Sequence, residues 1–186
     1  MRPASRQEDT KPAEEIDKNK QPTSAAQLLE THFINVLLRR PNLLYRIDRL
    51  LQEASLNRMG FEDFGYTDHK ELFRLIRQSL EQDDNQPEEY LLDNLPEPLK
   101  GLVEEMLGKP LAFDPVEERV LDDLMRTILK MRLLAIDESI NQLRFFQEDV
   151  QQQSDLREDA YMGLVNQARQ SRQILDQASR KLTGHR

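Results

Sequence analysis

The sequence predicts an all-α protein in which a compact helical bundle is followed by a long connecting helix and an antiparallel helical hairpin. Charged residues make up 32% of the 186-residue chain and only 6 residues are glycine, which favours helices with polar outer faces over a turn-rich β-protein. Leu, Glu, Gln, Arg and Ala, all good helix formers, are abundant. No glycine or proline occurs between Pro115 and Gly163, so a long helix fits there.

The composition also restricts the classes of function. Cysteine is absent, which excludes disulfides and cysteine-ligated zinc in this chain. No apolar run approaches the ~18–20 residues that cross a bilayer, and the amino terminus lacks the apolar stretch of a secretory signal. We therefore expect a cytoplasmic protein without membrane contact. The net charge of −8 argues against direct nucleic-acid binding.

Residues 1–23 are predicted to form a disordered linker. Ile16 is the only large aliphatic residue after Met1 in this stretch, which is too little apolar surface to offset the entropy cost of ordering it. Positive and negative residues balance there. The segment is either a solvated tail or a tether to a preceding part of a longer protein, and the tether is the favoured interpretation.

Residues 24–135 are predicted to form the bundle. Ser24 and Gln27 have the spacing of a capping box, so a helix should begin there and run to Arg39. Pro41 should separate it from a second helix. The apolar residues expected to face the core from these two helices are Leu28, Phe33, Val36, Leu37, Leu43, Leu44, Ile47, Leu50 and Leu51.

A third helix should begin at Thr67–Asp68 and end near Glu81, with Asp68 and Glu71 spaced as a capping pair. Two shorter helices are expected over residues 87–92 and 96–107. His69, near the start of the third helix, is expected to be a partly exposed surface residue. The aromatic residues expected in the core are Phe33, Phe61, Phe64 and Phe73.

Residues 136–186 are predicted to form the hairpin. The long helix should start at Asp114-Pro115, because Asp is a good cap and Pro is favoured at the first helical position. The break before the last helix is expected between Gln151 and Asp155. The predicted seam of the last helix is a heptad pattern at Tyr161, Leu164, Ala168, Ser171, Leu175, Ala178 and Leu182. The facing stripe on the long helix consists of Ile136, Ile140, Leu143 and Val150.

No catalytic, cofactor-binding or metal site is predicted. The three histidines are scattered along the chain, and no zinc-protease, P-loop or glycine-rich phosphate motif occurs. Neighbouring acidic residues on a helix project ~100° apart, so the acidic pairs do not converge on a cation. An enzyme activity of this chain by itself is therefore not expected.

The candidate site is instead a protein-docking surface on the hairpin. Apolar residues lie there outside the predicted seam, and apolar surface on more than one face of a hairpin favours a partner. In the alternative interpretation these residues fold back onto the bundle. Cations near the end of the chain could orient docking. The predicted partner-binding residues are Phe145, Phe146, Tyr161, Met162, Val165, Arg169, Arg172, Ile174, Arg180 and Lys181.

Leu28-Leu29-Glu30, followed by Leu37-Leu38-Arg39-Arg40-Pro41-Asn42-Leu43-Leu44, makes a leucine-rich helix that ends in a basic, proline-containing turn. This pattern resembles the opening of the carboxyl-terminal, helicase-binding region of bacterial DNA primases. Phe61-Glu62-Asp63-Phe64, followed by Asp68-His69 and Leu72-Phe73, resembles a pattern shared with the amino-terminal domain of replicative helicases. Here Asp68 and His69 are adjacent, which departs from the family spacing. The long helix with its hairpin resembles the primase and not the helicase, and the resemblance covers roughly residues 26–183.

The resemblance implies a function for the whole chain. In that family the bundle and hairpin dock on the amino-terminal domains of the hexameric replicative helicase and couple primer synthesis to the replication fork. The chain would then be a monomeric module without a cofactor, joined by residues 1–23 to the polymerase part of a primase. Two alternatives stay open: a helicase-type assembly domain, and an unrelated scaffold that dimerises through its carboxyl-terminal coiled coil.

Overall fold

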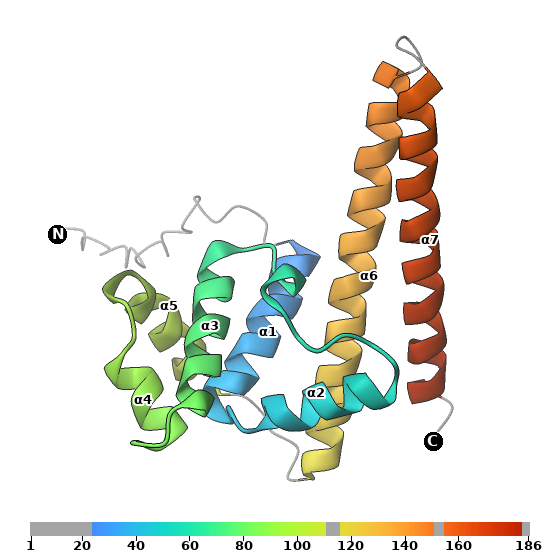
Figure 1. The fold of residues 1–186 in the computed structure, drawn as a ribbon. Helices are drawn as coiled ribbons and strands as arrows, with labels where there is room; N and C mark the ends of the chain where they lie inside the picture. Colours follow the sequence, from blue (N-terminus) through green and yellow to red (C-terminus); the bar gives the residue numbers. More distant parts are fainter. Residues whose placement is uncertain (1–23, 111–115, 151–154, 184–186) are drawn as a thin grey trace, which may run out of the picture.

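The computed structural model describes residues 24–110, 116–150 and 155–183, and every regular element in these ranges is helical (Figure 1). The all-α prediction is therefore confirmed. The helices are α1 (Ala25–Arg39), α2 (Leu43–Glu53), α3 (Thr67–Glu81), α4 (Pro87–Asp93), α5 (Glu97–Gly108), α6 (Glu117–Val150) and α7 (Asp155–Thr183), with a 3-10 turn η1 (Phe61–Asp63) before α3. Among the helices just named, none combines the length and apolar character needed to cross a membrane.

Local hydrogen bonds define the start of α1 and the end of α2. The Ser24 hydroxyl accepts a hydrogen bond from the Gln27 backbone N–H at 3.0 Å, as expected for a capping residue. Helix α2 ends in a Schellman motif, in which the Leu56 N–H donates to the Leu51 carbonyl and the Ser55 N–H donates to the Gln52 carbonyl. Ser55 accordingly has a positive φ of 61°.

The bundle core lies where α1, α3 and the first half of α6 meet. The rings of Phe33, Phe64 and Phe73 form its aromatic centre, with Phe64 lying 6.0 Å from Phe33 and 4.9 Å from Phe73 between ring centroids. Leu124 and Ile128 of α6 are fully buried in the same cluster. The first part of α6 is thus a core helix of the bundle.

Three local predictions for the bundle are wrong. Leu28, expected in the core, is 58% exposed. Phe61 is 43% exposed, and its ring packs edge-on against Phe73 and does not enter the core. The predicted capping pair of Asp68 and Glu71 does not form, since α3 already begins at Thr67.

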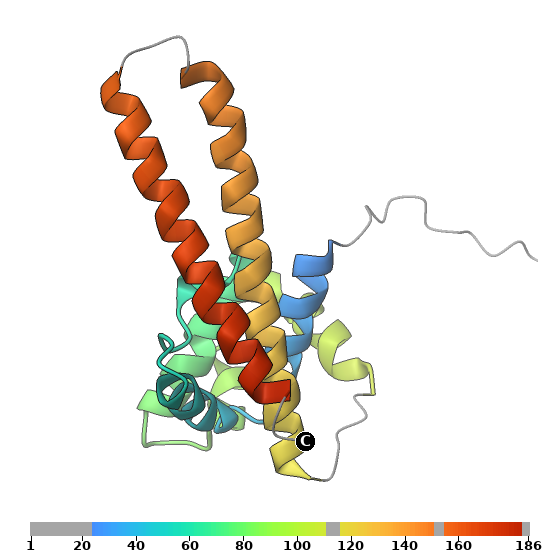
Figure 2. The same ribbon diagram turned by 90° about the vertical axis from the view of Figure 1, so that its right-hand side faces the viewer.

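Helices α6 and α7 lie side by side and antiparallel, and together they extend well beyond the bundle (Figures 1 and 2). Helix α6 has 34 residues, which corresponds to a length of about 50 Å. Helix α6 ends at Val150 and α7 begins at Asp155, so the predicted break lies in residues 151–154, outside the described residues. The helix begins at Glu117, two residues after Pro115; Asp114 and Pro115 themselves lie outside the described residues. The predicted division at residue 135 falls within α6, and the separation into two subdomains stays a prediction.

Candidate protein-docking surface

The contact between α6 and α7 differs from the predicted heptad seam. Leu175 and Ala178 of α7 are buried, as predicted, but they cluster with Leu129 of α6, which lies outside the predicted stripe; Ile136 of that stripe packs against the same cluster. Nearer the tip, however, Leu164 is 52% exposed, whereas Val165 is only 8% exposed. Val165 is therefore a contact residue within the chain and does not belong to a docking surface.

The structure does not gather the other predicted docking residues into one patch. Met162 and Ile174 are both exposed, but they are separated by about 18 Å along α7 and point in different directions. Tyr161 is half-buried. Arg172 forms an ion pair with Asp137 across the helix pair and lies 4.0 Å from Asp176. The side chains of Phe145, Phe146, Val150 and Leu182 lie outside the described residues.

The basic residues of α7 form a separate, outward-facing strip. Arg169, Arg172 and Arg180 line a surface hollow together with Gln173, Asp176 and Gln177. Lys181 is exposed next to it. Ile174 does not take part in this strip, because it lies on the flank of α7 that is directed toward the bundle.

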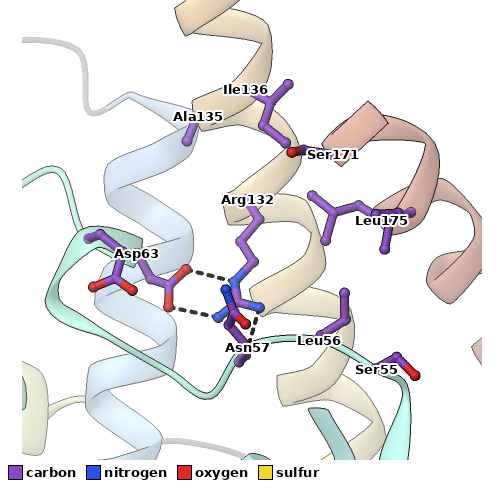
Figure 3. Close-up of a pocket in the computed structure, with 11 residues that line it drawn as sticks. Ser55, Leu56, Asn57, Asp63, Arg132, Ala135, Ile136, Ser171 and Leu175 are labelled. Atoms are coloured by element: carbon purple, nitrogen blue, oxygen red, sulfur yellow. Dashed lines mark hydrogen bonds and ion pairs between the residues drawn. The ribbon is translucent and has the colours of Figure 1, made fainter. Parts of the chain in front are cut away.

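A pocket of about 400 Å³ lies at the junction of the bundle with α6 and α7 (Figure 3). Its walls come from four parts of the chain: the loop after α2, η1, the middle of α6 and the second half of α7. Of the predicted docking residues, Ile174 lines this pocket. The complete lining consists of Ser55, Leu56, Asn57, Glu62, Asp63, Arg132, Ala135, Ile136, Ser171, Ile174 and Leu175.

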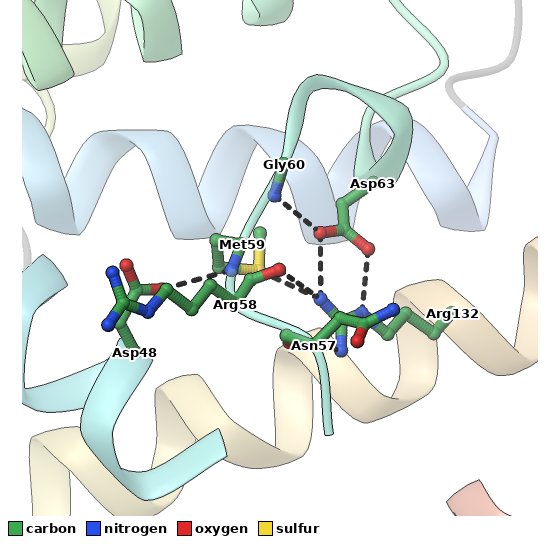
Figure 4. A network of polar contacts seen from close by, with 7 residues as sticks. All are labelled: Asp48, Asn57, Arg58, Met59, Gly60, Asp63 and Arg132. Atoms are coloured by element: carbon green, nitrogen blue, oxygen red, sulfur yellow. Dashed lines mark hydrogen bonds and ion pairs between the residues drawn. The ribbon is translucent and has the colours of Figure 1, made fainter. Parts of the chain in front are cut away.

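One wall of the pocket is fixed by a network centred on Arg132 of α6 (Figure 4). The Arg132 guanidinium donates two hydrogen bonds to the Asp63 carboxylate, from Nε at 2.6 Å and from Nη2 at 2.9 Å. It also donates to the backbone carbonyls of Asn57 at 3.0 Å and Arg58 at 3.1 Å. Asp63 in turn accepts the N–H of Gly60 at 2.9 Å. A two-bonded arginine–carboxylate pair holds its partners in a defined orientation, so this network ties the loop to α6.

Glu62 supplies the remaining charge at the pocket. Its side chain is exposed, and within the described part of the chain it makes no hydrogen bond or ion pair. Arg132 and Asp63 neutralise each other, so the pocket carries one uncompensated negative charge. Neither Glu62 nor Leu56 could be assigned from sequence periodicity, because both lie in the irregular stretch between α2 and α3.

A buried polar pair, Glu30 and His69, lies apart from this pocket. His69 is 3% exposed, so the prediction of a partly exposed surface residue is wrong. Its Nδ1 lies 2.8 Å from the Glu30 carboxylate and its Nε2 lies 3.3 Å from the Thr31 hydroxyl. Glu30 also accepts the backbone N–H groups of Gly65 and Tyr66. These bonds join residues that are far apart in sequence, and the local pattern contains no signal for them.

The Glu30 carboxylate also holds the loop that leads into α3. Glu30 lies on α1 and accepts the backbone N–H groups of Gly65 and Tyr66 from this loop.

Among the described residues no group of three His, Cys, Asp or Glu side chains could hold a metal ion. Comparison of the chain with protein-family models, with curated proteins and with solved structures finds no match.

Proposed function

We propose that this chain is the helicase-docking module of a bacterial DNA primase and that it binds the amino-terminal domains of the hexameric replicative helicase. The observation that carries the proposal is the extension of α6 and α7 beyond the bundle (Figures 1 and 2). Met162 and Leu164, in the first half of α7, and Ile174, in its second half, are exposed. Exposed aliphatic side chains on a projecting element are suited to burial in a protein interface. The primase-like motifs of residues 28–44 and 61–73 support the same proposal.

In this proposal the chain acts in the cytoplasm, where it holds the primase at the replication fork. It contributes no catalytic group and needs no cofactor, and primer synthesis belongs to other domains of the parent primase. It does not contact nucleic acid directly, and it is monomeric until the helicase binds. Residues 1–23 serve as the connection to the polymerase part.

The two alternatives account for less of the structure. A dimerising coiled coil would use the seam from Tyr161 to Leu182, but Leu175 and Ala178 of that seam are covered by α6 of the same chain. The interpretation as a helicase-type assembly domain leaves the projecting part of α6 and α7 without a role.

A titration with a hexameric bacterial replicative helicase tests the proposal. We expect saturable binding of the full chain in low salt by isothermal titration calorimetry. Leu164→Asp on α7 should weaken binding, whereas Leu92→Asp should leave it unchanged, because Leu92 is similarly exposed (59%) but lies on α4, far from α7 (Figure 1). Absence of binding by the unmodified chain would exclude the helicase as its partner, and a concentration-dependent dimer in sedimentation would favour the scaffold.

A further inference from the structure

The pocket at the base of α7 has the chemistry of a receptor for one apolar side chain. Leu56, Ile136 and Ile174 line it from three different elements, and Leu175 lies beside them. Ile174 remains 44% exposed. The pocket volume of about 400 Å³ falls within the ~300–1,000 Å³ range of ligand-binding clefts. An aliphatic side chain of a partner would therefore cover apolar surface that the chain leaves in contact with water.

The charge at the rim of the pocket favours a positively charged partner. Glu62 is its one charged side chain without an ion pair among the described residues, since Arg132 and Asp63 are engaged with each other. An anionic ligand would be repelled there, because complementary charge guides the approach of a partner and like charge opposes it. Ser55, Asn57 and Ser171 add polar groups at the same rim.

The rim is also held in place before any partner arrives. Arg132 fixes the Asn57 and Arg58 carbonyls, and Asp63 fixes the Gly60 N–H (Figure 4). The Schellman motif fixes Leu56 on the other side. A pre-ordered surface loses less conformational entropy on binding, which favours affinity for a given contact area.

We propose that this pocket receives an amphipathic helix of the partner protein, which inserts one large aliphatic side chain between Leu56, Ile136 and Ile174 and places a Lys or Arg one turn away against Glu62. Residues three or four apart share one face of a helix, so both groups can reach the pocket together. This inference rests on the proposed function in one respect, namely that the partner is the replicative helicase.

The test compares two pocket variants with an outer-face control in the same titration with the hexameric helicase. Ile174→Asp should weaken binding roughly 30-fold or more, as for a central interface residue. Glu62→Gln should weaken it roughly 2- to 5-fold and Glu62→Lys further, and both losses should shrink at high salt. Gln173→Asp, on the outer strip of α7, should bind like the unmodified chain. Circular dichroism and the melting temperature of each variant verify folding.

A second probe separates this inference from the proposed function. Two designed helical peptides share one leucine face and carry either Lys or Glu on their polar face. Amide chemical shifts of Glu62, Ile174 and their neighbours should move with the Lys peptide and not with the Glu peptide, and Glu62→Lys should abolish the response. Helicase binding that is unaffected by Ile174→Asp and Glu62→Lys would overturn the pocket as the docking site while the proposed function stands. If the Lys peptide binds as expected but the helicase does not bind, the preference of the pocket for a basic helix stands and the helicase is excluded as the partner.

Discussion

At the scale of single residues, the buried carboxylate of Glu30 orders the segment before α3. It is 3% exposed and accepts hydrogen bonds from Gly65, Tyr66 and His69, so three donors from one segment converge on one side chain of α1. A buried charge is tolerated only when it is fully hydrogen-bonded, and this one is. Because His69 sits on the first turn of α3, the same pair also fixes the position of α3 against α1.

Glu30→Ala should therefore destabilise the bundle strongly. The substitution leaves two backbone N–H groups and His69 Nδ1 without an acceptor, and we expect a loss of about 3–5 kcal/mol in the free energy of unfolding. Urea denaturation followed by circular dichroism measures this loss. Glu71→Ala is the matched control on α3, since it removes only a half-exposed pair with Arg74 and should cost less than about 0.5 kcal/mol. Equal effects of the two substitutions would show that the convergence on Glu30 contributes no stability.

Ser55 offers a residue-scale test of backbone conformation. Its φ of 61° is a left-handed conformation that costs a side-chain-bearing residue about 1–2 kcal/mol, and glycine is the usual residue at this point of a Schellman motif. Ser55→Gly should raise the free energy of unfolding by about 0.5 kcal/mol, since the relief is partly offset by the greater freedom of glycine in the unfolded chain. Ser55→Ala keeps the strain and should change stability little. A destabilised Ser55→Gly would mean that the serine side chain has a role of its own.

At the scale of elements, α6 is the helix that joins the two parts of the molecule. Its first half contributes Leu124 and Ile128 to the bundle core, and its second half pairs with α7. Arg132 lies between these two halves and binds the loop from Asn57 to Asp63. Its side chain is 13% exposed and that of Asp63 is 6% exposed, so the pair is largely removed from water.

Arg132→Leu should cost about 3–5 kcal/mol of stability, because it leaves the Asp63 carboxylate buried without its cation. Arg126→Leu on the same helix is the control, since Arg126 is exposed, and we expect a change below about 0.5 kcal/mol. If Asp63→Asn together with Arg132→Leu restores much of the loss, the penalty comes from the orphaned carboxylate. A loss that is identical for Arg132 and Arg126 would contradict the role of the network.

The elements also show which parts of the structure were predictable. Helix positions followed from local signals such as Ser24 before α1, Pro41 before α2 and the long stretch without Gly or Pro in α6. The wrong assignments concern contacts made at a distance. His69 is buried in contact with Glu30, which lies 39 residues earlier, and Val165 of α7 is buried where the heptad pattern placed Leu164. The pocket is formed by four parts of the chain that lie far apart in sequence, and of its lining residues only Ile174 was among the predicted docking residues.

At the scale of the whole molecule, two apolar clusters divide the stabilising contacts. The larger one joins α1 to α5 with the first half of α6, and the smaller one consists of Leu129, Leu175 and Ala178 with Leu56, Leu133 and Ile136 around them. Leu56 packs against both clusters, so they touch at the pocket. The arrangement favours a bundle that is stable by itself and an α7 helix that can be released from α6 at lower cost.

Leu175→Asp should release α7 while the bundle stays folded. Leu175 is 5% exposed in the smaller cluster, and an unpaired carboxylate there costs several kcal/mol, whereas the larger cluster does not contain this residue. We expect amide hydrogen exchange of α7 to lose its protection, with the main thermal transition lowered by only a few degrees. Gln177→Asp, exposed on the same helix, should leave both measurements unchanged. Since Leu56 belongs to both clusters, a collapse of the main transition in Leu175→Asp would show instead that α7 and the bundle unfold as one cooperative unit.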